Sequence, residues 1–126
     1  MNLIEQAKQY AEGIKTLTAW LGAGAVTVDP RTSQDRADVC LKCPQNVEVK
    51  LIESIASAIK RQVELKNKLG LRVNGEKSLH TCSGCGCALR LKIHVPIQSL
   101  GLDEEELNRF DSACWMRKEF NQLKKT

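Results

Sequence analysis

Aromatic residues are scarce in this chain, which has two Trp, two Phe and one Tyr among its 126 residues. A core built mainly from Leu, Ile, Val and Ala gains less buried apolar area per side chain than one rich in aromatic rings. A domain this small therefore benefits from a covalent or metal cross-link. Six cysteines are available to supply it.

The chain also lacks a long apolar segment and a signal-like start. Its first residues, MNLIEQAKQYAEG, have neither a basic n-region nor an apolar h-region, and no stretch reaches 18 apolar residues. We therefore expect no signal peptide and no membrane partner. In a reducing cytoplasm disulfides rarely persist, so paired cysteines are interpreted first as metal ligands.

Strong charge of one sign is absent as well. With 19 Lys and Arg against 15 Asp and Glu, the formal charge is +4, which falls well short of a strongly basic nucleic-acid binder. A content of 42% hydrophobic and 27% charged residues is typical of one globular domain. These figures exclude a disordered tail protein and a multi-domain enzyme.

Apolar spacing predicts two main helices. The first covers residues 3–21, and Gly22 and Gly24 follow it as stop signals. This N-terminal helix (1–24) either packs on a zinc-binding domain (25–126), giving one compact unit, or serves as a docking or oligomerisation helix. The second helix covers 47–69 and ends at Gly70, and Ser33 is expected to cap a short helix that runs into Cys40.

Short β elements are expected between and after these helices. Asn74-Gly75 predicts a hairpin turn between 71–73 and 78–81. Residues 88–95 alternate between apolar and polar side chains, which predicts a half-buried strand with Lys92 and His94 on its polar side. Asp103 is the expected N-cap of a short acidic helix. The predicted fold class is α+β and helix-rich, with two main helices and a short β hairpin or strand held by a zinc-knuckle, zinc-ribbon-like site.

The cysteines carry the clearest chemical signal. They form two C-x-x-C pairs, Cys40 with Cys43 and Cys82 with Cys85, followed by Cys87 and later Cys114. The C-x-x-C spacing lets a tight turn aim two sulfurs at one ion while backbone N–H groups point at them. We therefore expect one structural Zn²⁺ held by the four paired cysteines.

Other ligand sets remain open. Cys87 or Cys114 can replace one of the four, and two zinc ions or an iron–sulfur cluster are lesser alternatives. His80 and His94 are further candidate ligands. A thiolate-bound zinc ion is negatively charged, so cations close to the pairs in sequence are candidate donors to the sulfurs: Arg36, Lys42, Arg90 and Lys92.

A whole-chain pattern of residues resembles a known group of proteins. The shared positions are Ala7-Lys8, Gly13-Ile14, Trp20-Leu21-Gly22, Val28, Arg36-Ala37, Cys40-x-x-Cys43-Pro44-x-Asn46, Cys82-x-x-Cys85-x-Cys87-x-Leu89-x-x-Lys92-x-His94-x-Pro96 and Cys114-Trp115. The order resembles small, uncharacterised cysteine-rich proteins of tailed bacteriophages and prophages. The resemblance implies phage origin, a location in the host cytoplasm or the virion, zinc binding, and a role for all six cysteines together. It implies no established activity.

Two functional hypotheses follow. The chain has no nucleophile–base pair and no phosphate-binding glycine loop, so we expect no enzyme. The first hypothesis is a zinc-stabilised module that binds a phage or host protein, with the N-terminal helix and Trp115 as contacts. The second is nucleic-acid binding through basic residues of helix 47–69 and the loop after it: Lys60, Arg61, Lys66, Lys68, Arg72 and Lys77. A redox-active C-x-x-C dithiol conflicts with the sequence context of both pairs.

Overall fold

The computed structural model describes residues 3–48 and 53–124. Within them the elements follow in the order α1 (Leu3–Gly22), α2 (Pro30–Lys42), β1 (Asn46–Val47), α3 (Glu53–Lys68), η1 (Glu76–Ser78), β2 (Thr81–Cys82), α4 (Leu89–Lys92), η2 (Ile97–Leu100), α5 (Glu104–Leu107) and α6 (Trp115–Lys124). The described residues are thus helix-rich, with one two-stranded antiparallel sheet in which Asn46 pairs with Cys82 and Val47 with Thr81. Among these helices none is long and apolar enough to cross a bilayer.

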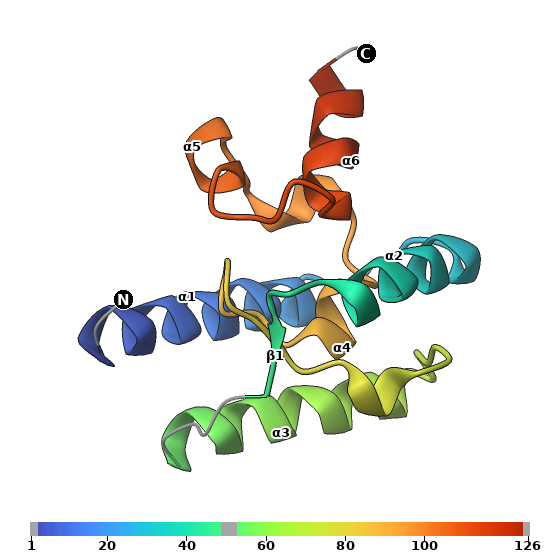
Figure 1. Cartoon of the computed structure of the whole chain (residues 1–126). Helices are drawn as coiled ribbons and strands as arrows, with labels where there is room; N and C mark the ends of the chain where they lie inside the picture. Colours follow the sequence, from blue (N-terminus) through green and yellow to red (C-terminus); the bar gives the residue numbers. More distant parts are fainter. Residues whose placement is uncertain (1–2, 49–52, 125–126) are drawn as a thin grey trace.

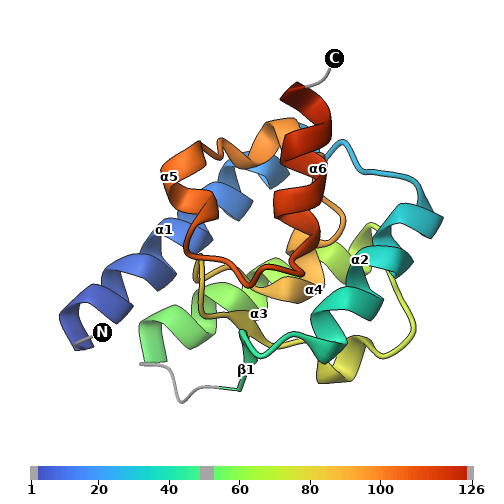
Figure 2. The ribbon, with the colours of Figure 1, turned by 45° about the horizontal axis from the view of Figure 1, so that its top comes forward.

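The helices surround a central segment that contains α4. Helices α1 and α3 lie side by side, and α5 and α6 lie on the opposite side of α1 from α3 (Figures 1 and 2). Seven side chains of the central segment are buried: Ala88, Leu89, Leu91, Lys92, Ile93, His94 and Val95. Burial on every side explains why a helical turn, rather than a strand at a surface, is stable here.

Helix α1 is part of the core. Its Leu17 and Trp20 are buried in the main apolar cluster, as the spacing of apolar residues in 3–21 predicts. Gln62 of α3 donates its side-chain amide to the carbonyl of Ile14 at 2.9 Å, which fixes the two helices together. The indole N–H of Trp20 donates to the carbonyl of Val26 at 2.7 Å and holds the chain that leaves the helix.

The helix ends follow capping chemistry, with one correction. Helix α2 begins at Pro30 with Asp29 as its N-cap, because the Asp29 carboxylate accepts the Thr32 backbone N–H at 2.9 Å. The expected cap at Ser33 is wrong, because Ser33 lies inside the helix and its side chain is buried. The N-cap at Asp103 is confirmed, since its carboxylate accepts the N–H of Glu106 at 2.8 Å.

One further prediction is confirmed in part and two are wrong. The helix expected over 47–69 covers Glu53–Lys68, because residues 46–47 pair as a strand; the apolar positions 51 and 52 lie outside the described residues. The expected hairpin is replaced by a turn and η1, and β2 pairs with β1 instead of with residues 71–73. The strand expected over 88–95 is the short helix α4 followed by a turn, in which Lys92 N–H donates to the Ala88 carbonyl at 3.1 Å.

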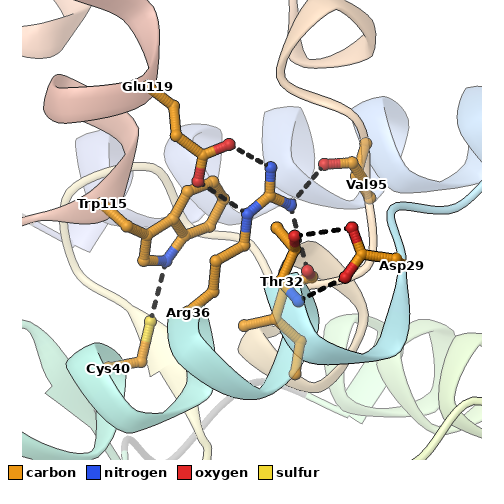
Figure 3. Close-up of polar contacts among 8 residues, drawn as sticks. Asp29, Thr32, Arg36, Cys40, Val95, Trp115 and Glu119 are labelled. Carbon is orange, nitrogen blue, oxygen red and sulfur yellow. Dashed lines mark hydrogen bonds and ion pairs between the residues drawn. The ribbon is translucent and has the colours of Figure 1, made fainter.

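Arg36 joins three distant parts of the chain inside the protein. Its guanidinium forms two hydrogen bonds with the Glu119 carboxylate, at 2.8 and 2.5 Å, and donates to the carbonyls of Ile93 at 3.0 Å and Val95 at 2.7 Å. It also lies over the Trp115 ring, 4.1 Å from the centroid (Figure 3). Helix α2, the turn after α4, and α6 are therefore held by one buried cation.

His94 lies in the core beside positive charge. Its Nδ1 is 2.9 Å from the Ser33 hydroxyl, and its Nε2 is buried without a hydrogen-bond partner among the described residues. Burial, together with the nearby charges of Lys66 and Arg36, lowers the pKa of His94 to about 4, although Glu76 opposes the shift. The imidazole is therefore neutral in the folded protein at neutral pH.

We expect acid to destabilise the protein through His94. The pKa is lower in the folded state than in the unfolded chain, so the unfolded chain binds the proton first, and stability falls as the pH drops from about 6.5 to about 4. The loss is about 3 kcal/mol in the free energy of unfolding. Urea denaturation of the wild type and of His94→Asn across this range measures it. Over the same pH range, the variant should lose about 3 kcal/mol less stability than the wild type. Equal losses in the two proteins would contradict the assignment of the effect to His94.

Candidate metal centre

The first cysteine pair lies at the end of α2. Cys40 is buried in the last turn of the helix, and Cys43 caps it with its N–H bonded to the Cys40 carbonyl at 3.1 Å. Gln45 directs its backbone N–H at the Cys43 sulfur at 3.4 Å, and the indole N–H of Trp115 donates to the Cys40 sulfur at 3.2 Å (Figure 3). Donors directed at both sulfurs are the arrangement that stabilises thiolates in a metal-binding turn.

The second group of cysteines lies in a tight loop after β2. The Gly86 N–H bonds to the Cys82 carbonyl at 2.7 Å, and the Cys82 N–H bonds to the Cys87 carbonyl at 3.0 Å. The thiol of Cys87 donates to the Gly13 carbonyl of α1 at 3.8 Å. The expected turn therefore forms, with Cys87 included in it.

The small sheet brings the two cysteine loops together. Asn46, three residues after Cys43, is opposite Cys82, and the Ser83 N–H donates to the Gln45 carbonyl at 2.9 Å. Cys114 directly precedes Trp115, whose indole N–H donates to the Cys40 sulfur at 3.2 Å. All six cysteines of the chain thus belong to one region, although 74 positions separate the first from the last.

Helix α1 packs directly against the second cysteine loop at glycine positions. A side chain at Gly13 would place its Cβ 2.5 Å from the backbone carbon of Gly86, which itself has a φ of +78°. Gln9 donates its side-chain amide to the Ser83 carbonyl at 2.8 Å. The two backbones therefore meet without intervening side chains, and the loop that carries Cys85 and Cys87 is held against α1.

The buried ammonium of Lys92 lies among these thiols. Lys92 is 1% exposed, its Nζ donates to the Cys85 sulfur, and it lies 4.9 Å from the centroid of the Phe110 ring. Its charge helps to lower the pKa of Cys85 and opposes the rise in the pKa of the other thiols with a resolved shift, which are Cys40, Cys82, Cys87 and Cys114. A buried ammonium needs an anionic partner, because an uncompensated charge in the interior is strongly unfavourable.

The pKa values of the thiols separate into two groups. Burial would raise the pKa of Cys85, but hydrogen bonds from Cys82 and Cys87 and the charge of Lys92 hold it well below its usual range. Hydrogen bonding to Cys85, followed by burial, raises the pKa of both Cys82 and Cys87. Burial raises the pKa of Cys40 to about 11 and also raises that of Cys114. Cys85 is therefore the thiolate that balances Lys92 in the absence of another ion.

The described residues form no closed metal coordination sphere. Within residues 3–48 and 53–124, no group of three or more His, Cys, Asp and Glu side chains is arranged to hold a metal ion. His94 bonds to Ser33 in the core, so its expected place on a polar strand face is wrong. His80 is half-buried, with its Nε2 3.9 Å from the Glu48 carboxylate.

The four cations proposed as donors to the sulfurs have different positions. Lys92 contacts a sulfur, whereas Arg36 binds Glu119 and Arg90 donates to the carbonyls of Leu79 and Lys77. Lys42 is exposed. Neither alternation nor spacing indicated that Lys92 would be buried.

The basic residues proposed for nucleic-acid binding do not all reach the surface. Five side chains are exposed: Lys60, Arg61, Lys68, Arg72 and Lys77. The expectation that Lys66 belongs to the outer face is wrong, because it is fully buried, forms an ion pair with Glu76 and donates to the Leu71 carbonyl at 2.6 Å.

Comparison with known proteins gives no match to a family model, a curated protein or a solved structure. The resemblance to phage proteins stays a prediction.

Proposed function

We propose that this protein is a non-enzymatic, zinc-stabilised module that binds another protein. Cys40, Cys43, Cys82 and Cys85 would hold one Zn²⁺ as a structural ion with no open position for chemistry. The observation that carries the proposal is the buried Lys92 ammonium among the thiols, because a zinc ion bound by four thiolates supplies the negative charge that this cation requires.

The donor set fits zinc in its chemistry. Thiolates are preferred ligands of Zn²⁺, and N–H groups already point at the sulfurs of Cys40 and Cys43. Binding requires the four side chains to rotate toward a common ion, because their present arrangement is open. Cys87 and Cys114 stay alternative ligands from the sequence, so the choice of four among six is part of the proposal.

The binding surface differs from the one that the sequence suggests. Trp20 and Trp115 are buried, so they are unavailable as contacts. Leu65 lies on α3, and Leu69 follows the end of the helix one turn later. Their side chains are 46% and 53% exposed and offer an apolar contact instead. The resemblance to phage proteins suggests a protein of the phage particle or of the host as the partner.

Nucleic acid is the second candidate partner, supported by the five exposed basic side chains on α3 and the following loop. Binding of this kind would weaken steeply with salt. A salt-dependent gel shift that is lost when Lys60, Arg61 and Lys68 are changed to Ala would favour it over a protein partner.

Native mass spectrometry of the full chain, purified with its partner, tests the proposal. We expect one zinc ion per chain and a bound protein. The double variant Leu65→Ser/Leu69→Ser should keep the zinc and lose the partner, because it replaces only these two exposed leucine side chains. Cys82→Ser should lose the zinc. A wild-type protein that binds no zinc under reducing conditions, or a double variant that keeps its partner, would contradict the respective half of the proposal.

A further inference from the structure

A groove with a volume of about 350 Å³ lies between α3 and the small sheet. Figure 1 shows β1 and α4 on the same side of α3. The volume is within the range of pockets that bind small molecules, about 300–1,000 Å³. The cysteines are not among the lining residues, and neither are Leu65 and Leu69. The groove is therefore separate from both the metal centre and the apolar contact proposed for a protein partner.

The sheet forms one wall of the groove. Val47 pairs with Thr81, and Thr81 forms a bridge with Ala88, so the three residues stand in one row across neighbouring extended segments. Side chains in such a row point to the same face of a sheet. All three residues line the groove, so this face of the sheet is the one that lies toward α3.

Helix α3 supplies the opposite wall with apolar side chains. Ala56, Ile59 and Val63 follow one another at spacings of three and four residues, which puts them on one face of the helix. Each wall also contains an alanine, Ala56 on α3 and Ala88 on the sheet, which leaves room that a longer side chain would fill. A ligand therefore needs an apolar body to fit between the two walls.

Positive charge prevails among the polar residues of the groove, which are Glu48, Lys60, His80, Thr81 and Arg90. The side chain of Glu48 is 84% exposed, and its carboxylate lies 3.9 Å from Nε2 of His80. Lys60 and Arg90 form no ion pair with a carboxylate of the residues that the structure describes. An anion in the groove therefore meets two cations whose charge is not balanced by a carboxylate.

Arg90 is held in place before any ligand binds. Its Nε donates to the Leu79 carbonyl and its Nη2 to the Lys77 carbonyl, each at 3.2 Å. These two bonds do not use Nη1. A guanidinium fixed in this way loses little freedom when it binds a carboxylate, and charge-assisted hydrogen bonds of this kind are among the strong ones.

We propose that this groove binds a small molecule with an apolar chain and a carboxylate, such as a medium-chain fatty acid. The chain lies between α3 and the sheet, and the carboxylate binds Lys60 and Arg90. The two cations favour a carboxylate over an amine. The apolar walls favour such a molecule over nucleic acid, because a phosphate backbone has no apolar body to fill the groove. The site does not rest on the proposed function, since neither zinc nor a protein partner takes part in it.

Decanoate is the probe, and decanol and decylamine are its neutral and cationic counterparts. Their binding to the full chain is measured by isothermal titration calorimetry at neutral pH, below the concentration at which micelles form. We expect decanoate to bind about tenfold more tightly than decanol, because hydrogen bonds to charged groups add to the contacts of the apolar chain. Decylamine should bind most weakly. Decylamine that binds as tightly as decanoate would overturn the proposal.

Two pairs of variants at exposed positions of α3 locate the site. Ala56→Trp places a large side chain in the groove and should abolish binding of decanoate, whereas Ser57→Trp, next to it and outside the lining, should bind like the wild type. Lys60→Gln should remove most of the preference for decanoate over decanol. Lys68→Gln removes the same charge outside the groove and should keep that preference.

Two results with these variants would also overturn the proposal. Equal affinity for decanoate in Ala56→Trp and Ser57→Trp would place the ligand outside the groove. Loss of the protein partner, but not of decanoate, in Ala56→Trp would assign the groove to that partner. A protein that binds decanoate as expected but contains no zinc and no partner would contradict the proposed function alone.

Discussion

Removal of zinc is expected to lower the melting temperature of this protein by about 15 °C. A ligand that binds only the folded state stabilises it by about 4 kcal/mol when its free concentration is about a thousand times its Kd. For a chain of 126 residues, each kcal/mol corresponds to roughly 4 °C. The expectation is measured by comparing thermal unfolding under reducing conditions with zinc and with a chelator.

The size of this effect follows from where the cysteine loops lie. Cys40 lies in the last turn of α2, whereas Cys82 ends β2, which the second cysteine loop and α4 follow. Without the ion, the short β1–β2 pairing, a few loop hydrogen bonds and the bonds from Arg36 to the turn after α4 connect these parts, and Lys92 keeps the Cys85 sulfur and the Phe110 ring as contacts. The main apolar cluster remains, so we expect a less stable fold instead of complete unfolding.

Cysteine variants distinguish the effect of zinc loss on stability from other effects of the chelator. Cys82→Ser should melt at the temperature of the chelated wild type and should show no further change with chelator. The indole of Trp115 bonds to the Cys40 sulfur, so its fluorescence should change when zinc binds to the wild type. Equal melting temperatures for the zinc-loaded and chelated wild type would contradict a structural role for zinc.

Local sequence patterns predicted the elements that are stabilised by interactions between residues close together in the sequence. The apolar spacing over 3–21 gives α1, Asp103 caps α5, and Gly70, with a φ of +74°, follows the end of α3. Each of these features depends on residues within a few positions of one another. The C-x-x-C pairs are local in the same way, and their turns form as expected.

The rest depended on partners far apart in the sequence. The alternation over 88–95 predicted a strand, because Lys92 and His94 were assigned to its solvent-exposed side. In the structure both side chains are buried. Their partners, Cys85 and Ser33, are known only once the chain is folded. Lys66 was assigned to solvent for the same reason, since its partner Glu76 lies after the helix. A sequence pattern cannot distinguish an exposed cation from a buried and paired one.

Replacement of Arg36 is expected to cost about 3–5 kcal/mol in the free energy of unfolding. Arg36 is 2% exposed, and Arg36→Met leaves the Glu119 carboxylate without its partner and the carbonyls of Ile93 and Val95 without these donors. Loss of one member of a buried, hydrogen-bonded ion pair costs about this much, because the remaining charge stays desolvated. Loss of the contact with the Trp115 ring adds to it. Urea denaturation at neutral pH measures the change.

Two further variants decide whether the cost comes from the buried pair. Arg31→Met changes an exposed arginine in the first turn of the same helix, so it should alter stability by less than about 0.5 kcal/mol. Arg36→Met/Glu119→Met removes both charges, so it should recover part of the stability lost in Arg36→Met, because no carboxylate is then left unpaired. Equal losses in the single and double variants would show that Arg36 acts through its contacts with Ile93, Val95 and Trp115 alone.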